Sequence, residues 1–203
     1  MPIRKGEAWG APGALPADGV LVRTDAEARA VVTAARRAGE APPVLGLLGG
    51  DLCRTLGGRG DSGRLRSELA MTFPCDVGAV LADGRLHWFV AHLVARRSWW
   101  RGRAFLAMNA AWLGPWNAGP KAHPGDGLLD TYDARVPAGQ RLGMRRRLPL
   151  GAHLPHPAVR ERRTAAIQVE LERALPVYLD GERVLEARSL SIRAEPDALT
   201  VVV

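Results

Sequence analysis

The sequence has few cysteines, few aromatic residues and no long apolar run, and each shortage excludes a class of protein. Its two cysteines, Cys53 and Cys75, are too few for a disulfide framework or for a zinc site built from thiolates. No apolar run approaches the roughly 20 residues that a membrane-spanning helix needs. Met1–Pro16 also lacks the apolar core of a signal peptide. We therefore expect a cytoplasmic protein with both thiols reduced and buried.

Arginine is abundant. Lys and Arg together number 28 against 21 acidic residues, nearly all of the basic residues are arginine, and the formal net charge is +7. Such a surface suits anionic partners such as phospholipid head groups, nucleotides or nucleic acid. A GC-rich genome produces the same composition, so charge alone does not choose a partner. The 47% apolar content of the 203 residues allows one substantial core, or a small domain joined to a larger one.

The first third of the chain has the pattern of part of a parallel-sheet domain. Residues 1–17 are rich in glycine, proline and alanine, which indicates a flexible arm. Thr24 is a suitable N-cap for an amphipathic helix. Strand, helix, strand and helix are predicted in turn at 20–22, 25–38, 44–48 and 51–56. We assign 18–70 to a truncated α/β segment of the nucleotide-binding type.

The rest of the chain, 71–203, consists of short apolar runs separated by turns. Asp-Gly pairs at 83–84, 126–127 and 180–181 are strong hairpin signals. One helix is predicted over 139–148 and should stop at Pro149. Strands are predicted at 77–82, 86–95, 104–110, 128–136, 165–171, 177–180, 190–194 and 199–203. The fold class is therefore α+β: a partial parallel-sheet segment followed by a larger antiparallel β-sandwich.

Three motifs occur in order within this second part. They are a stretch from Asn109 that ends in Asp126-Gly-Leu-Leu-Asp130, the run Gly151-Ala-His153-Leu-Pro-His156-Pro-Ala-Val159, and the turn Asp180-Gly-Glu182. Together they resemble the second-domain signatures of the diacylglycerol kinase and sphingosine kinase family of lipid kinases, over residues 76–203. The resemblance implies a β-sandwich of the lipid-kinase/NAD-kinase type. It also implies ATP-dependent phosphorylation of a lipid hydroxyl, such as that of diacylglycerol.

The resemblance also assigns roles to single residues. Asp180 and Glu182 would supply the general base that accepts the hydroxyl proton. Magnesium would bind the Asp126 carboxylate and the carbonyl oxygens of His123 and Leu128, which are the hard donors this ion prefers. The residues alone favour a plainer interpretation, in which each Asp-Gly pair is a hairpin turn and Glu182 is a solvated side chain.

The phosphate loops depart from the family pattern. The family carries Gly-Gly-Asp-Gly-Thr and then Gly-Thr-Gly-Asn-Asp, whose backbone N–H groups cradle phosphates. Here Arg23-Thr-Asp25-Ala-Glu27 keeps only the Asp, and Leu47-Leu-Gly49-Gly50-Asp51 keeps one Gly and the Asp. Side chains in place of glycines restrict φ and crowd the approach of a phosphate. Any bound ATP would lie near Asp25, Gly49, Gly50 and Asp51.

Two histidines in the second motif are candidates for a metal pair. His153 and His156 would lie on one face of a helix, but Pro155 and Pro157 break that helix. We interpret both histidines as ordering the loop that follows the predicted helix.

Three functions remain open. The first is a lipid kinase at the membrane face, with ATP and Mg²⁺ as cofactors. The second, favoured by the degenerate loops, is a non-catalytic pseudokinase that binds lipid or a partner kinase. The third, a nucleic-acid module, rests on charge and on Trp99-Trp100 with their flanking arginines, which equally suit a membrane interface or a plain hairpin. We expect a peripheral membrane location and not nucleic acid; an open sheet edge in 18–70 would allow a homodimer.

Overall fold

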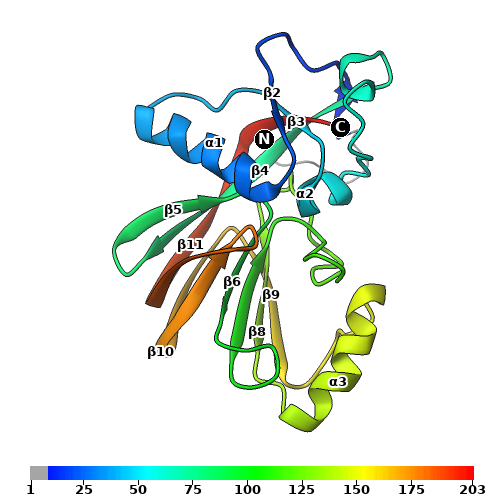
Figure 1. Ribbon diagram of the computed structural model, residues 1–203. Helices are drawn as coiled ribbons and strands as arrows, with labels where there is room; N and C mark the ends of the chain where they lie inside the picture. The colour runs from blue at the N-terminus through cyan, green and yellow to red at the C-terminus, as the bar shows by residue number, and fades with distance from the viewer. Residues whose placement is uncertain (1–8) are drawn as a thin grey trace.

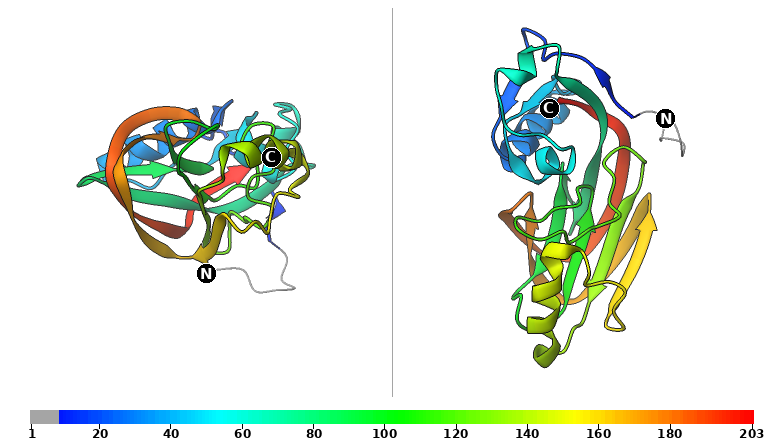
Figure 2. Two further views of the ribbon diagram at one scale, coloured as in Figure 1. Left: turned by 90° about the horizontal axis from the view of Figure 1, so that it is seen from below. Right: turned by 90° about the vertical axis from the view of Figure 1, so that its right-hand side faces the viewer.

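The computed structural model describes residues 9–203, and one long curved sheet runs through most of it (Figure 1). The main path of the sheet pairs its strands in the order β1-β4-β11-β10-β6-β7-β8-β9. The strands are β1 Ala11–Pro12, β4 Met71–Ala82, β11 Glu182–Val202, β10 Ala166–Leu179, β6 His92–Arg96, β7 Ala104–Met108, β8 Leu129–Ala134 and β9 Val159–Thr164. A further strand, β5 Arg85–Phe89, pairs with β4. Seen from below, the sheet curls around its core (Figure 2).

A small parallel part lies at one end of this sheet. β2 Val20–Val22 pairs in parallel with β3 Leu45–Leu47, and β3 pairs in parallel with the end of β11. Helices α1 Asp25–Ala38 and α2 Gly50–Thr55 follow these two strands. The predicted alternation of strands and helices is confirmed. This parallel part joins the main sheet where β3 pairs with β11, with Leu45 opposite Val201.

Helix α1 begins and ends with standard caps. The Thr24 hydroxyl accepts the N–H of Glu27 at 3.1 Å, and the Glu27 carboxylate accepts the N–H of Arg23 at 2.6 Å. The first bond satisfies a donor that the helix start leaves open, and the second ties the Glu27 side chain to the residue before the N-cap, as in a capping box. Gly39 ends the helix at φ +74°, a left-handed conformation that glycine adopts without strain.

The sandwich core lies between the curled halves of the sheet. Side chains from β4, β5, β6, β7, β10 and β11 fill it, including Phe89, Phe105, Leu93, Leu179 and Leu190. Gly78 is paired with Phe89, and a Cβ at Gly78 would lie 2.1 Å from the Phe89 ring. The aromatic ring therefore occupies the space that a larger residue in β4 would need.

The predicted helix over 139–148 is confirmed as α3 Ala138–Arg147, followed by a 3-10 turn at Leu148–Leu150. Another 3-10 turn spans Arg64–Arg66. The two predicted strands 190–194 and 199–203 are one strand, β11, with a register shift between Glu195 and Leu199. The single predicted run 86–95 is two strands, β5 and β6.

Two local predictions were wrong. Strand β9 was missed because its sequence, Val-Arg-Glu-Arg-Arg-Thr, has almost no apolar alternation. The predicted flexible arm is packed from residue 9 onward: β1 pairs with β4, Leu15 is buried, and the Trp9 and Phe73 ring centroids are 4.8 Å apart. The first eight residues of that arm lie outside the described residues.

Candidate functional site

The two aspartates assigned to the phosphate loops meet at the start of α2. Asp25, the first residue of α1, is buried, and its carboxylate accepts the backbone N–H of Asp51 at 2.5 Å and of Leu52 at 3.1 Å. These are N–H groups that a helix start leaves without an intrahelical partner. An internal carboxylate therefore occupies the donors of the second predicted phosphate loop.

The two glycines of that loop have a packing reason. Gly50 has φ +96°, and a Cβ there would lie 2.5 Å from the Asp25 carboxylate. At Gly49 a Cβ would lie 2.6 Å from the carbonyl oxygen of Arg23. Glycine at both positions lets the two loops approach each other directly.

Asp51 connects α2 to the β-domain. Its carboxylate accepts the backbone N–H of Gly114 at 2.9 Å and pairs with Nε2 of His92 at 2.9 Å. Arg54, one turn later, stacks 3.4 Å from the ring centroid of Trp112 and donates to the Gly114 carbonyl at 3.1 Å. The loop at 112–114 is thereby held against the predicted nucleotide segment.

Asp180 lies at the turn between β10 and β11 and is also buried. Its carboxylate accepts three backbone N–H groups, from Val90 at 3.0 Å, Ala91 at 2.8 Å and His92 at 3.1 Å. Residue Asp180 has φ +51° and is followed by Gly181, as a tight hairpin turn requires. Through these three bonds the Asp180 carboxylate, which was proposed as a base, connects the β10–β11 hairpin to the segment between β5 and β6.

The second residue proposed as a base is exposed. Glu182 is paired with Arg29 of α1, and its side chain retains 64% of its accessible surface. Arg29 Nε also lies 3.7 Å from Asp180 Oδ2. The arginine thus links α1 to both acidic side chains of the turn.

His92 is the member of this cluster that the sequence prediction missed. It lies on β6 between Asp51 and the Asp180 turn, and its side chain is 2% exposed. His92 belongs to none of the motifs. Its position at the start of a strand, after an apolar run, did not indicate a functional role.

Burial and charge act in opposite directions on these groups. Burial raises the pKa of Asp180 to about 6, against the lowering effect of His92 and of the backbone N–H groups. Burial also raises the pKa of Asp25. Burial alone would lower the pKa of His92, but the bond to Asp51 and the charge of Asp180 raise it. In spite of burial, the bonds to His92 and to the Gly114 N–H lower the pKa of Asp51, so Asp51 is the aspartate of the cluster whose charge is favoured.

Asp25, Asp51 and His92 could together contact one cation, because a ligand atom from each lies within 4.8 Å of the others. In this structure their atoms are already engaged with backbone N–H groups and with one another.

The predicted magnesium site differs from expectation. One Asp126 oxygen accepts the Leu128 N–H at 2.9 Å, and the other is paired with Arg163 of β9. The His123 ring packs on Trp9 with centroids 4.3 Å apart. The only predicted carboxylate ligand is therefore already paired with a cation of the chain itself, the Arg163 guanidinium.

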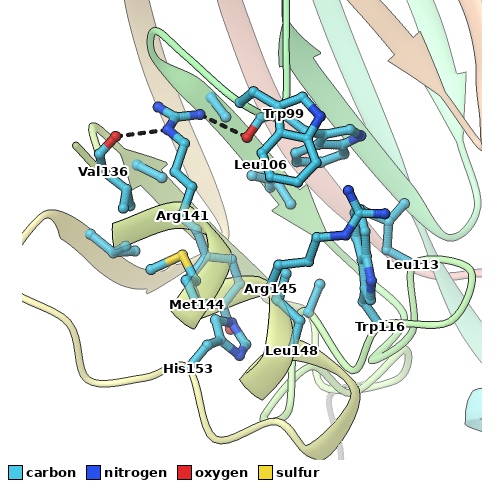
Figure 3. Close-up of a pocket in the computed structure, with 16 residues that line it drawn as sticks. Trp99, Leu106, Leu113, Trp116, Val136, Arg141, Met144, Arg145, Leu148 and His153 are labelled. Atoms are coloured by element: carbon cyan, nitrogen blue, oxygen red, sulfur yellow. Dashed lines mark hydrogen bonds between the residues drawn. The ribbon is translucent and has the colours of Figure 1, made fainter. Parts of the chain in front are cut away.

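An apolar pocket lies elsewhere, between strands β7 and β8 and helix α3 (Figure 3). It encloses about 760 Å³, counted out to its open mouth. Arg141 holds the helix in place through bonds to the carbonyls of Val136 and Trp99 at 2.8 and 2.9 Å, and a further bond to that of Gly102. The main lining side chains are Trp99, Trp100, Leu106, Leu113, Trp116, Tyr132, Met144, Leu148 and Val159.

Two arginines, Arg141 and Arg145, are also among the residues that line this pocket. Arg145 lies over the rings of Trp100 and Trp116, at 4.9 and 5.4 Å from their centroids. Trp100 is 52% exposed. His153 forms part of the wall, whereas the Nδ1 of His156 accepts the N–H of Ala158 at 3.1 Å.

Sequence comparison identifies the β-domain. The model of the YegS C-terminal NAD kinase beta sandwich-like domain matches residues 96–203, more than half of the chain. This chain belongs to the YegS and diacylglycerol kinase family of lipid kinases. The family assignment and the antiparallel sandwich, both predicted from the motifs, are confirmed. No curated protein sequence matches the chain.

Solved structures support the same fold for this family member. A protein of Bacillus anthracis str. Sterne, provisionally described as a diacylglycerol kinase, superposes with a TM-score of 0.70 at 15% identity. That match covers 91% of this chain and 77% of the other. A structure described as a diacylglycerol kinase of the same strain gives 0.64 at 14% identity, covering 91% and 75%. At such identities the likeness concerns the fold alone.

No helix within residues 9–203 of this family member is both long and apolar enough to cross a membrane.

Proposed function

We propose that this member of the lipid-kinase family binds an amphiphilic lipid through its β-domain and does not hold ATP in the family's manner. One observation carries the part of the proposal that concerns ATP: the Asp25 carboxylate accepts the N–H groups of Asp51 and Leu52. A phosphate at the same helix start would have to displace that carboxylate and would meet its negative charge.

The first loop supports the same conclusion. Its own side chains satisfy the N–H groups of Arg23 and Glu27 through the capping box. Glu27 adds a second negative charge beside the position where a triphosphate would lie. The negative charges of Asp25 and Glu27 repel an anionic ligand at close range. Within the described residues, these two loops also offer it no vacant cradle of glycine N–H groups.

The lipid side of the proposal rests on the pocket under α3. It combines aromatic walls, an exposed Trp100 and nearby arginines, among them Arg97, Arg101 and Arg145. Indole rings favour the head-group level of a bilayer, and arginine pairs with lipid phosphate. We therefore propose peripheral binding at an anionic membrane surface, with an acyl chain as the occupant of the pocket.

Phosphoryl transfer to a lipid hydroxyl is the second candidate function. It is favoured by the convergence of Asp25, Asp51 and Asp180 around His92. Asp180, ionised above a pKa of about 6, would be the general base. Such a role requires the carboxylate to leave some of its three backbone donors when substrate binds.

Calorimetric titration with Mg·ATP separates the two candidates. We expect no binding heat at sub-millimolar nucleotide for the natural chain. Asp25→Ala uncovers the N–H groups of α2 and should bind Mg·ATP no more weakly than the natural chain. Asp18→Ala, which removes an exposed acidic side chain, is the control. Micromolar binding that Asp25→Ala abolishes would support the kinase and refute a closed cradle.

Vesicle flotation tests the lipid side separately. We expect binding to phosphatidylserine-containing vesicles that weakens with salt and falls several-fold in Trp100→Ala. Leu86→Ala on β5 is the matched control, since Leu86 is 44% exposed against 52% for Trp100. If Trp100→Ala and Leu86→Ala bind neutral vesicles equally well, the assignment of this face to an anionic membrane surface is contradicted.

A homodimer through the edge strand β2 stays a prediction. On the described path β2 pairs only with β3, so its other edge lacks a strand partner within residues 9–203.

A further inference from the structure

At one corner of the β-domain a single arginine, Arg163, lies beside two acidic side chains, Asp126 and Asp130. Asp126 follows the loop before β8, and Asp130 lies within β8. Arg163 is the direct register partner of Asp130 on the neighbouring strand β9. The sheet pairing therefore places the guanidinium between the two carboxylates.

The contacts of Arg163 reach both acids. Its guanidinium is paired with Asp126, and its Nε lies 4.0 Å from Asp130 Oδ1. The second oxygen of Asp126 accepts the Leu128 N–H at 2.9 Å. Each Asp126 oxygen therefore has a partner within the chain itself, and one of the two partners is a cation.

Asp130 depends on this arginine more strongly. Its side chain is 2% exposed, and neither carboxylate oxygen has a hydrogen-bond partner within the described part of the chain. A buried carboxylate without hydrogen bonds needs a nearby positive charge. The nearest cation to it is Arg163, since Lys121 is paired with Glu161 at 2.8 Å.

We propose that Arg163 takes the place of a bound cation at this corner, so that a guanidinium and not a metal ion joins Asp126 and Asp130. A guanidinium is always charged, and its planar fork matches carboxylates on two sides. A divalent ion beside Asp126 would meet the positive charge of Arg163 at close range, and the guanidinium already pairs with one of the two Asp126 oxygens. The chain thus carries its own counter-ion where the family resemblance implied magnesium.

Metal-dependent thermal unfolding of the whole chain tests this inference. At constant ionic strength, the melting temperature of the natural chain should not respond to millimolar MgCl₂ or CaCl₂. Arg163→Ala should melt lower and should regain stability with either salt. A rise of about 4 °C is the size that a ligand at about ten times its Kd gives to a domain of this length.

Two further variants identify the ligand group and the control. The double variant Arg163→Ala/Asp126→Asn should lose the metal response. Arg162→Ala changes a neighbouring exposed arginine on the same strand that does not pair with Asp126 or Asp130, and it should neither lower the melting temperature nor create a response.

The opposite results are equally clear. Stabilisation of the natural chain by Mg²⁺ that Asp126→Asn removes would overturn the proposal. An Arg163→Ala variant as stable as the natural chain, with no metal response, would do the same. If Arg163→Ala does not fold, Arg163→Lys takes its place, because lysine keeps the positive charge. The proposal expects this variant to fold and to show no change of melting temperature with metal. A melting temperature that rises with metal would contradict the proposal.

Discussion

Replacement of Asp180 by alanine should destabilise the chain strongly, because it leaves three buried backbone N–H groups without an acceptor. The groups of Val90, Ala91 and His92 all donate to this carboxylate. An orphaned buried donor costs about 1 kcal/mol at the low end of the usual range. Alanine at φ +51° adds about 1 kcal/mol, since a Cβ disfavours the left-handed region. The expected loss is therefore about 4 kcal/mol in the free energy of unfolding.

Urea denaturation at equilibrium measures this loss, and thermal unfolding should show a fall in melting temperature of about 8–16 °C for a chain of this size. Asp180→Asn should lose about half as much free energy, because it keeps one oxygen acceptor and tolerates positive φ.

The matched control is the β4–β5 turn. Asp83 also has positive φ, at +44°, and its carboxylate accepts the N–H groups of Arg188 and Ser189, but it is exposed to solvent. Asp83→Ala should lose much less, because water can replace the carboxylate. A change below about 1 kcal/mol for Asp180→Ala would refute the reasoning, since it would mean that water reaches these amides.

Two further predictions concern the same fold. Because the pKa of His92 is raised from 6.5, its pairing with Asp51 contributes stability that is complete below that value and is lost as pH rises through the raised one. The difference in melting temperature between the natural chain and His92→Gln should accordingly shrink from pH 6 towards pH 9; a difference that grows would contradict the sign. Gly78→Ala should lose about 1–3 kcal/mol in urea denaturation by colliding with Phe89. Gly143→Ala on α3, where a Cβ has no neighbour within 4 Å, should gain about 0.5–1 kcal/mol.

Local physics explains which elements could be predicted. Helix α1 carries its own cap at Thr24 and its own stop at Gly39, so its bounds follow from the sequence. Helix α3 likewise ends at Arg147, just before Pro149. The Asp-Gly pairs at 83–84 and 180–181 form hairpin turns with positive φ. By contrast β9 pairs with β8 through its backbone while its side chains are mostly polar, so periodicity gave no sign of it.

By itself, the sequence determined the family, the sandwich and the candidate acids, because ordered motifs and turn chemistry are local properties of the chain. The partners of those acids, in contrast, follow from the tertiary structure alone. Asp25 meets the start of α2, 26 residues later, and Asp180 meets Val90 to His92 on another strand. Strand pairing sets Arg163 opposite Asp130, from where it also reaches Asp126. Hydrogen-bond partners so distant in sequence are set by sheet register and by burial, which no local pattern encodes.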